Sequence, residues 1–97
     1  MGRVMDYRVL YSQTSRLQIK ALHPRARSII KAQIENLKEN PYLGKSLEKE
    51  LSGYHSLRTK RLRIIYKIDN SAHIIQIHYV GHRRDVYDLF KEALTRA

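Results

Sequence analysis

Short runs in which apolar and polar residues alternate mark four predicted strands along this chain. The first covers residues 7–11, where β-branched and aromatic residues dominate. The other three follow one another in the second half, at residues 54–61, 62–68 and 73–80. A tight turn near Lys60 and Arg61 and a second one at Asp69 and Asn70 separate them. This spacing predicts a three-stranded antiparallel meander, joined by the first strand into a four-stranded sheet.

Alternation also divides the last two strands between two faces of that sheet. One face is expected to be almost wholly apolar and to meet the helices, and it holds Ile64, Tyr66, Ile68, Ile75, Ile77 and Tyr79. The opposite face mixes apolar and polar groups, and Val80 is expected there. It leaves Arg63, Gln76 and His78 available to a ligand.

Helical periodicity predicts a hairpin of two helices after the first strand. Ser12 and Thr14 are capping residues for the first helix, whose apolar positions are Leu17, Ala21 and Leu22. Pro24 begins the second helix, because the first helical turn does not need the N–H that proline lacks. Its apolar stripe consists of Ala26, Ile29, Ile30, Ile34 and Leu37. It must end by residue 40, before Pro41, and the hairpin is expected to cover one face of the sheet.

Residues 41–53 are expected to form an ordered loop, attached to the core through Leu43, Leu47 and Leu51. A last helix is predicted over residues 85–96, with Asp85 as a plausible N-cap. Its apolar stripe consists of Val86, Leu89, Phe90 and Ala93, with Tyr87 at the edge. The expected fold class is therefore α+β, in a single domain over residues 1–97. Residues 1–4 could be an N-terminal extension, since Met5 is an alternative start.

The charge changes this picture. The chain has 19 Lys and Arg residues against 9 Asp and Glu, a formal net charge of +10. Such an excess is typical of a protein with a polyanionic partner, because cations placed on phosphates release condensed counterions. A well-solvated basic surface is the alternative. The clustering of the charge favours nucleic acid.

The chain contains no cysteine, which excludes disulfides, thiolate catalysis and cysteine-ligated metal and fits a reducing cytoplasm. No apolar run approaches the length of a membrane span, so no membrane association is expected. Imidazoles could act as acid or base, but no histidine pair has a metal-ligand spacing supported by a third acidic ligand. We therefore expect neither a metal nor another cofactor.

The candidate chemistry lies in a basic cluster near the predicted turn and the start of the last helix. Its members are Arg58, Lys60, Arg61, Arg63, Arg83 and Arg84. A solvated hairpin tip would explain most of these charges, and strand alternation separates Arg58 from Arg61. Arg63 is the most informative, because an arginine in mid-strand needs either a salt bridge or a ligand such as phosphate. Tyr87 is either a core aromatic residue or a ring and hydroxyl that hold RNA.

Two motifs in this order, LRIIYKID at residues 62–69 and GHRRDVY at 81–87, resemble the RelE/ParE toxin superfamily. The segments NPYLG (40–44) and LSGY (51–54) resemble its linker, and the match covers nearly the whole chain from Met5. The resemblance implies a RelE-like toxin of a type II toxin–antitoxin system. It further implies a metal-independent endoribonuclease that enters the ribosome and cleaves mRNA by attack of a ribose 2′-OH on the adjacent phosphate.

Carried over residue by residue, the resemblance assigns catalytic roles to Arg63, Arg83 and Tyr87, with Arg58 as an accessory phosphate contact. His82 is expected to be catalytic and to be a candidate general base. Contacts to RNA are expected from Lys60, Arg61, Arg84 and His55. RelE-type enzymes carry lysines on the second strand, where this chain has Tyr54 and Ser56. The general base is therefore open among His82, His55 and Lys60.

This departure leaves a ParE-like poison of DNA gyrase as the alternative function, and charge alone would also allow a nucleic-acid-binding domain without catalysis. The resemblance also implies partners: the ribosome with its mRNA, and an acidic RelB-like antitoxin. The resemblance also allows a heterotetramer of toxin and antitoxin.

Overall fold

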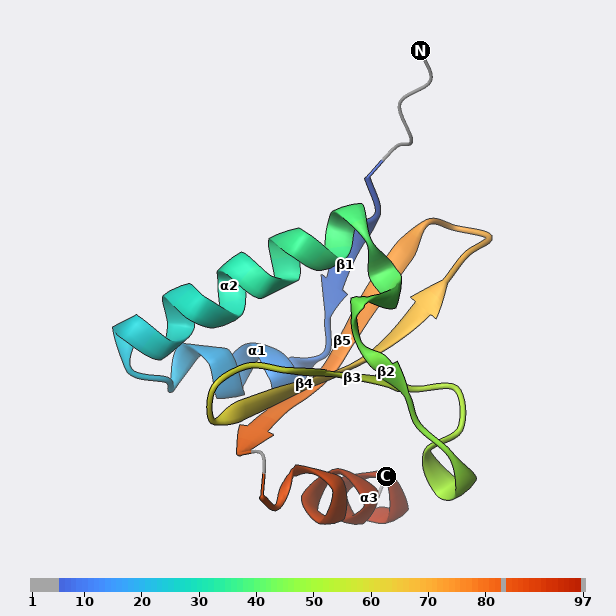
Figure 1. Cartoon of the computed structure of the whole chain (residues 1–97). Helices are drawn as coiled ribbons and strands as arrows, with labels where there is room; N and C mark the ends of the chain where they lie inside the picture. The colour runs from blue at the N-terminus through green and yellow to red at the C-terminus, as the bar shows by residue number, and fades with distance from the viewer. Residues whose placement is uncertain (1–5, 83, 97) are drawn as a thin grey trace.

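The computed structural model describes residues 6–82 and 84–96 (Figure 1). Its helices are α1 (Gln13–Lys20), α2 (Pro24–Glu39) and α3 (Val86–Arg96). Its strands are β1 (Arg8–Tyr11), β2 (Lys45–Ser46), β3 (His55–Arg58), β4 (Leu62–Asp69) and β5 (Ile74–His82). Two short 3-10 helices, Pro41–Leu43 and Lys49–Leu51, lie on either side of β2.

The strands form one mixed sheet in the order β1-β5-β4-β3-β2. The predicted α+β class and the meander β3-β4-β5 are confirmed, with β1 added in parallel to β5. The expectation of four strands is wrong, because the sheet has five. The fifth, β2, pairs Lys45 with Ser56 and Ser46 with His55, inside the segment predicted to be a loop.

Gly44 explains why the chain can approach β3 at this point. A Cβ atom at Gly44 would lie 2.7 Å from the backbone oxygen of Ser56 and 2.6 Å from the Tyr66 hydroxyl. Only glycine leaves room for so close an approach. The amide of Gly44 instead donates a hydrogen bond to the Tyr66 hydroxyl (3.0 Å), which in turn donates to the carbonyl of Pro41 (2.7 Å). These bonds fix β2 as an edge strand beside β3.

The helical hairpin covers one face of the sheet, as predicted, but α1 turns a different side toward it. Ser12 caps α1 by accepting from the amide of Ser15 (3.0 Å). The buried positions of α1 are Ser15 and Ile19, while Leu17 is 57% exposed. The reason is a long-range bond: the Ser15 hydroxyl donates to the carbonyl of Ile77 at 2.9 Å and so orients α1.

Helix α2 follows the prediction more closely. Ile30, Ile34 and Leu37 are fully buried against the sheet, whereas Ile29 is exposed at the edge of the contact. His23 caps the helix by accepting from the amide of Arg25 (3.1 Å).

The predicted assignment of faces on β5 is wrong for its last residues. A β-bulge interrupts the pairing, so that Tyr66 lies opposite Ile77 while Ile65 lies opposite Tyr79. One extra residue in a strand reverses the facing of everything beyond it. Val80 therefore joins the core under the hairpin, and Tyr79 turns to the opposite face.

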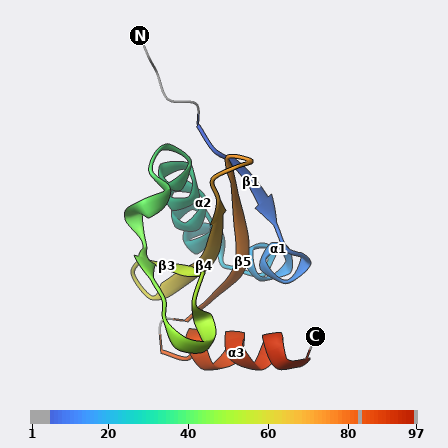
Figure 2. The same ribbon diagram turned by 90° about the vertical axis from the view of Figure 1, so that its right-hand side faces the viewer.

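On that opposite face, α3 builds a second, smaller core. Figures 1 and 2 show α3 on the side of the sheet away from α1 and α2. Val86 and Phe90 are its buried residues, whereas the predicted stripe residues Leu89 and Ala93 are exposed. This second core also contains Ile65, Tyr79, Leu47, Leu51 and Tyr54. The predicted anchors Leu47 and Leu51 are thus confirmed, but Leu43 is 47% exposed. Within the described residues, no helix has the length and apolar character needed to cross a membrane.

Candidate active site

On the face of the sheet that carries α3, three polar side chains lie together. Two of them, Arg63 and Tyr87, were predicted as site residues, and the third is Ser56. The guanidinium of Arg63, in β4, donates a hydrogen bond to the Tyr87 hydroxyl at 2.5 Å. Its central carbon also lies 5.1 Å from the centroid of the Tyr87 ring. The Tyr87 hydroxyl then donates to the hydroxyl of Ser56, in β3, at 3.1 Å. This Arg63–Tyr87–Ser56 cluster joins the sheet to the first turn of α3.

Within the described residues, the positive charge of Arg63 has no carboxylate partner. None of the ion pairs found in the described part of the chain includes Arg63. Its Nε atom is buried and makes no hydrogen bond. An unpaired buried donor costs about 1–3 kcal/mol, so native structures rarely leave one without a reason. The unpaired donor therefore marks Arg63 as a candidate functional residue.

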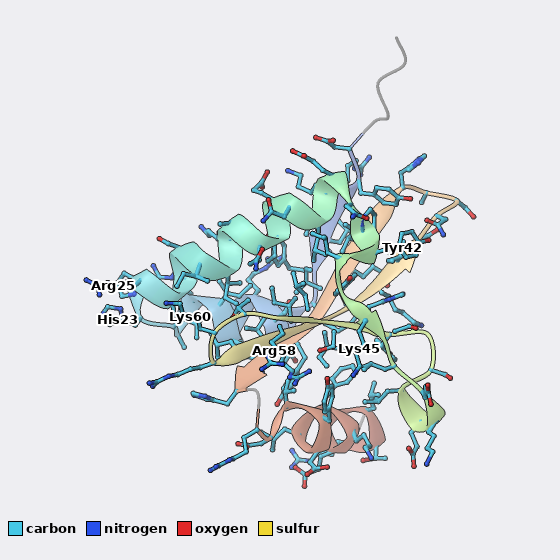
Figure 3. All side chains as sticks on the ribbon, viewed as in Figure 1. His23, Arg25, Tyr42, Lys45, Arg58 and Lys60 are labelled. Atoms are coloured by element: carbon cyan, nitrogen blue, oxygen red, sulfur yellow. The ribbon has the colours of Figure 1, made fainter. Side chains whose placement is uncertain are left out.

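A second arginine lies next to the first. The register pairs Arg58 of β3 directly with Arg63 of β4, so both side chains project from the face that carries α3. Figure 3 shows Arg58 directed into the space between the sheet and α3. Like charges opposite each other destabilise a sheet. Two facing guanidiniums without a carboxylate are an arrangement that an oxyanion stabilises.

A separate open hollow lies where the β3–β4 turn approaches the start of α3, and neither Arg58 nor Arg63 lines it. It is lined by Lys60, Arg61, His82, Arg84 and Asp85. All but Asp85 are basic residues, so the hollow brings together cations from the β3–β4 turn, the end of β5 and the segment before α3. Their roles in binding RNA or in catalysis stay predictions. Arg83, also assigned to this group, lies outside the described residues, and its role stays a prediction.

Two of the predicted histidines lie elsewhere. His55 pairs with Tyr66 and stacks on its ring, with centroids 5.3 Å apart, so it projects from the hairpin face of β3. Burial lowers the pKa of His55. His82 pairs with Leu62, whose side chain packs into the core under the hairpin. The structure therefore places neither imidazole on the Arg63 side of the sheet.

His78, predicted to face a ligand, instead helps to attach α3. Its ring lies 5.3 Å from Tyr54 and 6.3 Å from Phe90. Burial and then the nearby Lys67 lower the pKa of His78. Tyr54 has a structural role too, because its ring packs edge-on against Phe90 at 5.0 Å.

Ser56 belongs to the candidate site, but it was not predicted as a site residue. From the sequence it was named only as a position where RelE-type enzymes carry a lysine. Its signal in the sequence is alternation: Ser56 lies two positions before Arg58, which places both on one face of β3. Ser56 is 4% exposed, and its hydroxyl accepts a hydrogen bond from that of the half-buried Tyr87. Among the described residues, no group of three or more His, Asp or Glu side chains is placed to hold a metal ion.

The molecule is thus a small basic α+β domain, and one face of its sheet carries an arginine pair for which the described part of the chain supplies no carboxylate partner. The family model for the ParE toxin of the type II toxin–antitoxin system parDE matches residues 6–87. Toxin RelG of Mycobacterium tuberculosis is 33% identical over 85 residues, which cover 86% of this chain and 98% of RelG. The chain therefore belongs to the RelE/ParE superfamily of type II toxin–antitoxin toxins.

Solved structures agree with this assignment. The RelBE2 toxin–antitoxin complex of M. tuberculosis contains a chain that is 31% identical to this one, with a TM-score of 0.74. The match covers 80% of this chain and 99% of that chain. A mutant of E. coli toxin RelE in the free state has the same TM-score of 0.74 at 18% identity, covering 95% of this chain and 98% of that chain. At this identity the second match shows the fold alone.

Proposed function

We propose that this toxin is an endoribonuclease that cleaves mRNA on the ribosome without a metal ion. In the reaction, the ribose 2′-oxygen attacks the adjacent phosphorus and the bond from phosphorus to the 5′-oxygen breaks. The 2′-hydroxyl loses its proton and the leaving 5′-oxygen gains one, which leaves a 2′,3′-cyclic phosphate and a 5′-hydroxyl. Because the nucleophile belongs to the RNA, the protein need only position it, stabilise charge and move protons.

The observation that carries the proposal is the Arg63–Tyr87–Ser56 cluster beside Arg58. Among the described residues, no ion pair neutralises the guanidinium of Arg63, and its buried Nε has no hydrogen-bond partner. In this proposal Arg63 and Arg58 hold the non-bridging phosphate oxygens as negative charge accumulates on them. Ser56 keeps the Tyr87 phenol in place, where it can contact the same phosphate or the ribose. The role of Arg83 is proposed from the resemblance alone.

The test is primer extension on an mRNA translated in a reconstituted system with added toxin. The wild-type protein should produce breaks in the ribosomal A site, and Arg63→Ala should reduce the rate by about 10²–10³-fold, as for loss of one charge-stabilising donor. Tyr87→Phe should reduce it less, because the ring and its packing remain. Arg8→Gln is the matched control, because Arg8 is an exposed cation on β1, the edge strand at the other end of the sheet from β3 and β2. Intact mRNA with the wild-type toxin would refute the proposal.

A ParE-like action on DNA gyrase is the second candidate, because the matching family model is that of the ParE toxin. A gyrase supercoiling assay run beside the cleavage assay separates the two. Loss of supercoiling with intact mRNA would support the gyrase function in place of the nuclease function.

We further propose a cytoplasmic complex with an acidic RelB-like antitoxin, including a heterotetramer of two toxins and two antitoxins. The M. tuberculosis relative was solved as a toxin–antitoxin complex at 31% identity. The net charge of +10 suits an acidic partner that shields the cationic surface or displaces α3. Co-expression with an adjacent acidic reading frame should abolish toxicity and yield a complex whose mass, measured by light scattering, gives its stoichiometry.

A further inference from the structure

The edge strand β2 places one more cation on the face of the sheet that carries the candidate site. Lys45 pairs directly with Ser56, so its side chain projects from the same face as the Ser56 hydroxyl. Cβ atoms of directly paired residues lie about 4.5–5.5 Å apart. Ser56 is itself in hydrogen-bond contact with Tyr87. Lys45 therefore begins within one side-chain length of the Arg63–Tyr87–Ser56 cluster.

The side chain of Lys45 is available for a ligand. Lys45 is exposed, and the ion pairs found in residues 6–82 and 84–96 do not include it. Figure 3 shows Lys45 directed into the same space as Arg58, between the sheet and α3. The carboxylate of Glu50, in the segment that follows β2, is paired with Lys91 of α3 at 3.9 Å.

The register also separates Lys45 from the arginine pair by a defined amount. Lys45 lies opposite Ser56, two residues along β3 from Arg58. Two residues of a strand correspond to about 6.8 Å, and neighbouring strands lie about 4.8 Å apart. Lys45 is thus displaced from the arginine pair by more than the size of one phosphate group. If Arg58 and Arg63 hold one phosphate of an RNA strand, Lys45 is free to contact the neighbouring phosphate of the same RNA.

We propose that Lys45 binds the phosphate next to the scissile one, so that the RNA passes from the arginine pair across Tyr87 and Ser56 toward β2. This inference rests on the proposed nuclease function and adds a binding subsite to it. Lys45 is then a substrate contact away from the reacting atoms. Its loss should weaken binding and leave the chemical step intact.

The experiment is single-turnover cleavage of mRNA on programmed ribosomes, with the toxin titrated to saturation. Lys45→Gln should raise the half-saturating toxin concentration about two- to fivefold, as expected for one exposed charge contact. Its maximal rate should stay within about twofold of the wild-type rate. Lys45→Arg should behave as the wild type, because it keeps the charge.

Lys31→Gln is the matched control. Lys31 is exposed on α2, so this variant makes the same charge change on the opposite side of the sheet. It should leave both parameters unchanged.

The outcomes separate this inference from the proposed function. If the wild type cleaves and Lys45→Gln matches it in both parameters, the subsite is refuted and the nuclease proposal stands. A drop in maximal rate without a change in half-saturation would place Lys45 at the reacting phosphate and would also overturn the subsite. An equal effect of Lys31→Gln would show that the effect of Lys45→Gln comes from the net charge of the protein, and it would refute the subsite. Absence of cleavage by the wild type would refute the nuclease function itself.

Discussion

Two arginines of this chain show how differently a guanidinium can be used. Arg27 donates hydrogen bonds to the carbonyls of Ile19 (3.4 Å), Lys20 (3.2 Å) and Leu22 (3.0 Å), where α1 ends. Carbonyls at a helix C-terminus lack internal partners and attract cations, so Arg27 is structural. Arg63 makes one bond to a phenol and retains a buried donor without a partner. Its environment stabilises the folded protein poorly and suits an anion well.

The two residues should therefore respond in opposite ways to the same substitution. Arg63→Met removes an unsatisfied donor and the repulsion with Arg58, so the free energy of unfolding should stay constant or rise by about 1 kcal/mol. Arg27→Met should lower it by about 1–3 kcal/mol, because the carbonyls of Lys20 and Leu22 lose the donor that pairs with them. Urea unfolding followed by circular dichroism measures both. A loss of more than 1 kcal/mol in Arg63→Met would show that Arg63 has a mainly structural role.

At the level of residues, the sequence was sufficient to predict the central pair but not its surroundings. Arg63, now seen near the start of β4, and Tyr87 at the helix edge were predicted as site residues, and they are in contact. The hydroxyl of Ser56 was missed although alternation places it on the same face as Arg58. Lys45, the proposed phosphate contact, was missed because its position depends on which strand lies next to β3. Strand pairing between segments separated by a loop is a tertiary property that periodicity does not contain.

At the level of elements, regular periodicity was a reliable guide, and local irregularity was not. Both helices of the hairpin, the meander and α3 were predicted near their observed positions. The bulge on β5 was not predicted. Tyr79 and Val80 are both apolar and adjacent, so the alternation of the sequence does not show which of the two faces the core. The exposure of Leu89 was missed as well, since α3 meets only the small patch of the second core.

The strand β2 depends on Gly44, and this makes a prediction about the element. Gly44→Ala places a methyl group 2.7 Å from the backbone oxygen of Ser56, which cannot move without disturbing β3. Overpacking of this kind costs about 1–3 kcal/mol. Thermal unfolding should show a lower midpoint for Gly44→Ala, and its half-saturation in the cleavage assay should rise as for Lys45→Gln.

Ser46→Ala is the control for this variant, because Ser46 is an exposed residue of the same strand. It should unfold at the wild-type midpoint. A wild-type midpoint for Gly44→Ala would mean that the chain can move away from β3, and that β2 does not fix the position of Lys45.

At the scale of the whole molecule, one sheet separates two cores with different tasks. The larger core, under α1 and α2, contains most of the buried aliphatic residues and holds the sheet together. The smaller one attaches α3, and with it Tyr87, through a few aromatic contacts. The net charge of +10 adds self-repulsion that a polyanionic partner would relieve. The stability of the site is thus set largely by the smaller core.

That core contains a titratable group, so the stability of the toxin should depend on pH. Burial, and then Lys67, lower the pKa of His78, and burial lowers the pKa of His55. The unfolded chain, with histidine pKa values of about 6.5, then binds protons at a higher pH than the folded chain does. The free energy of unfolding should be highest above pH 6.5 and should fall as the pH decreases through the lower folded-state values. Urea unfolding at pH 8.0 and pH 5.5 measures this decrease, and the double variant His55→Gln/His78→Gln should lose most of it. If the double variant keeps the full decrease, other groups cause the pH dependence. Protonation of His78 then does not weaken the attachment of α3 through Tyr54 and Phe90.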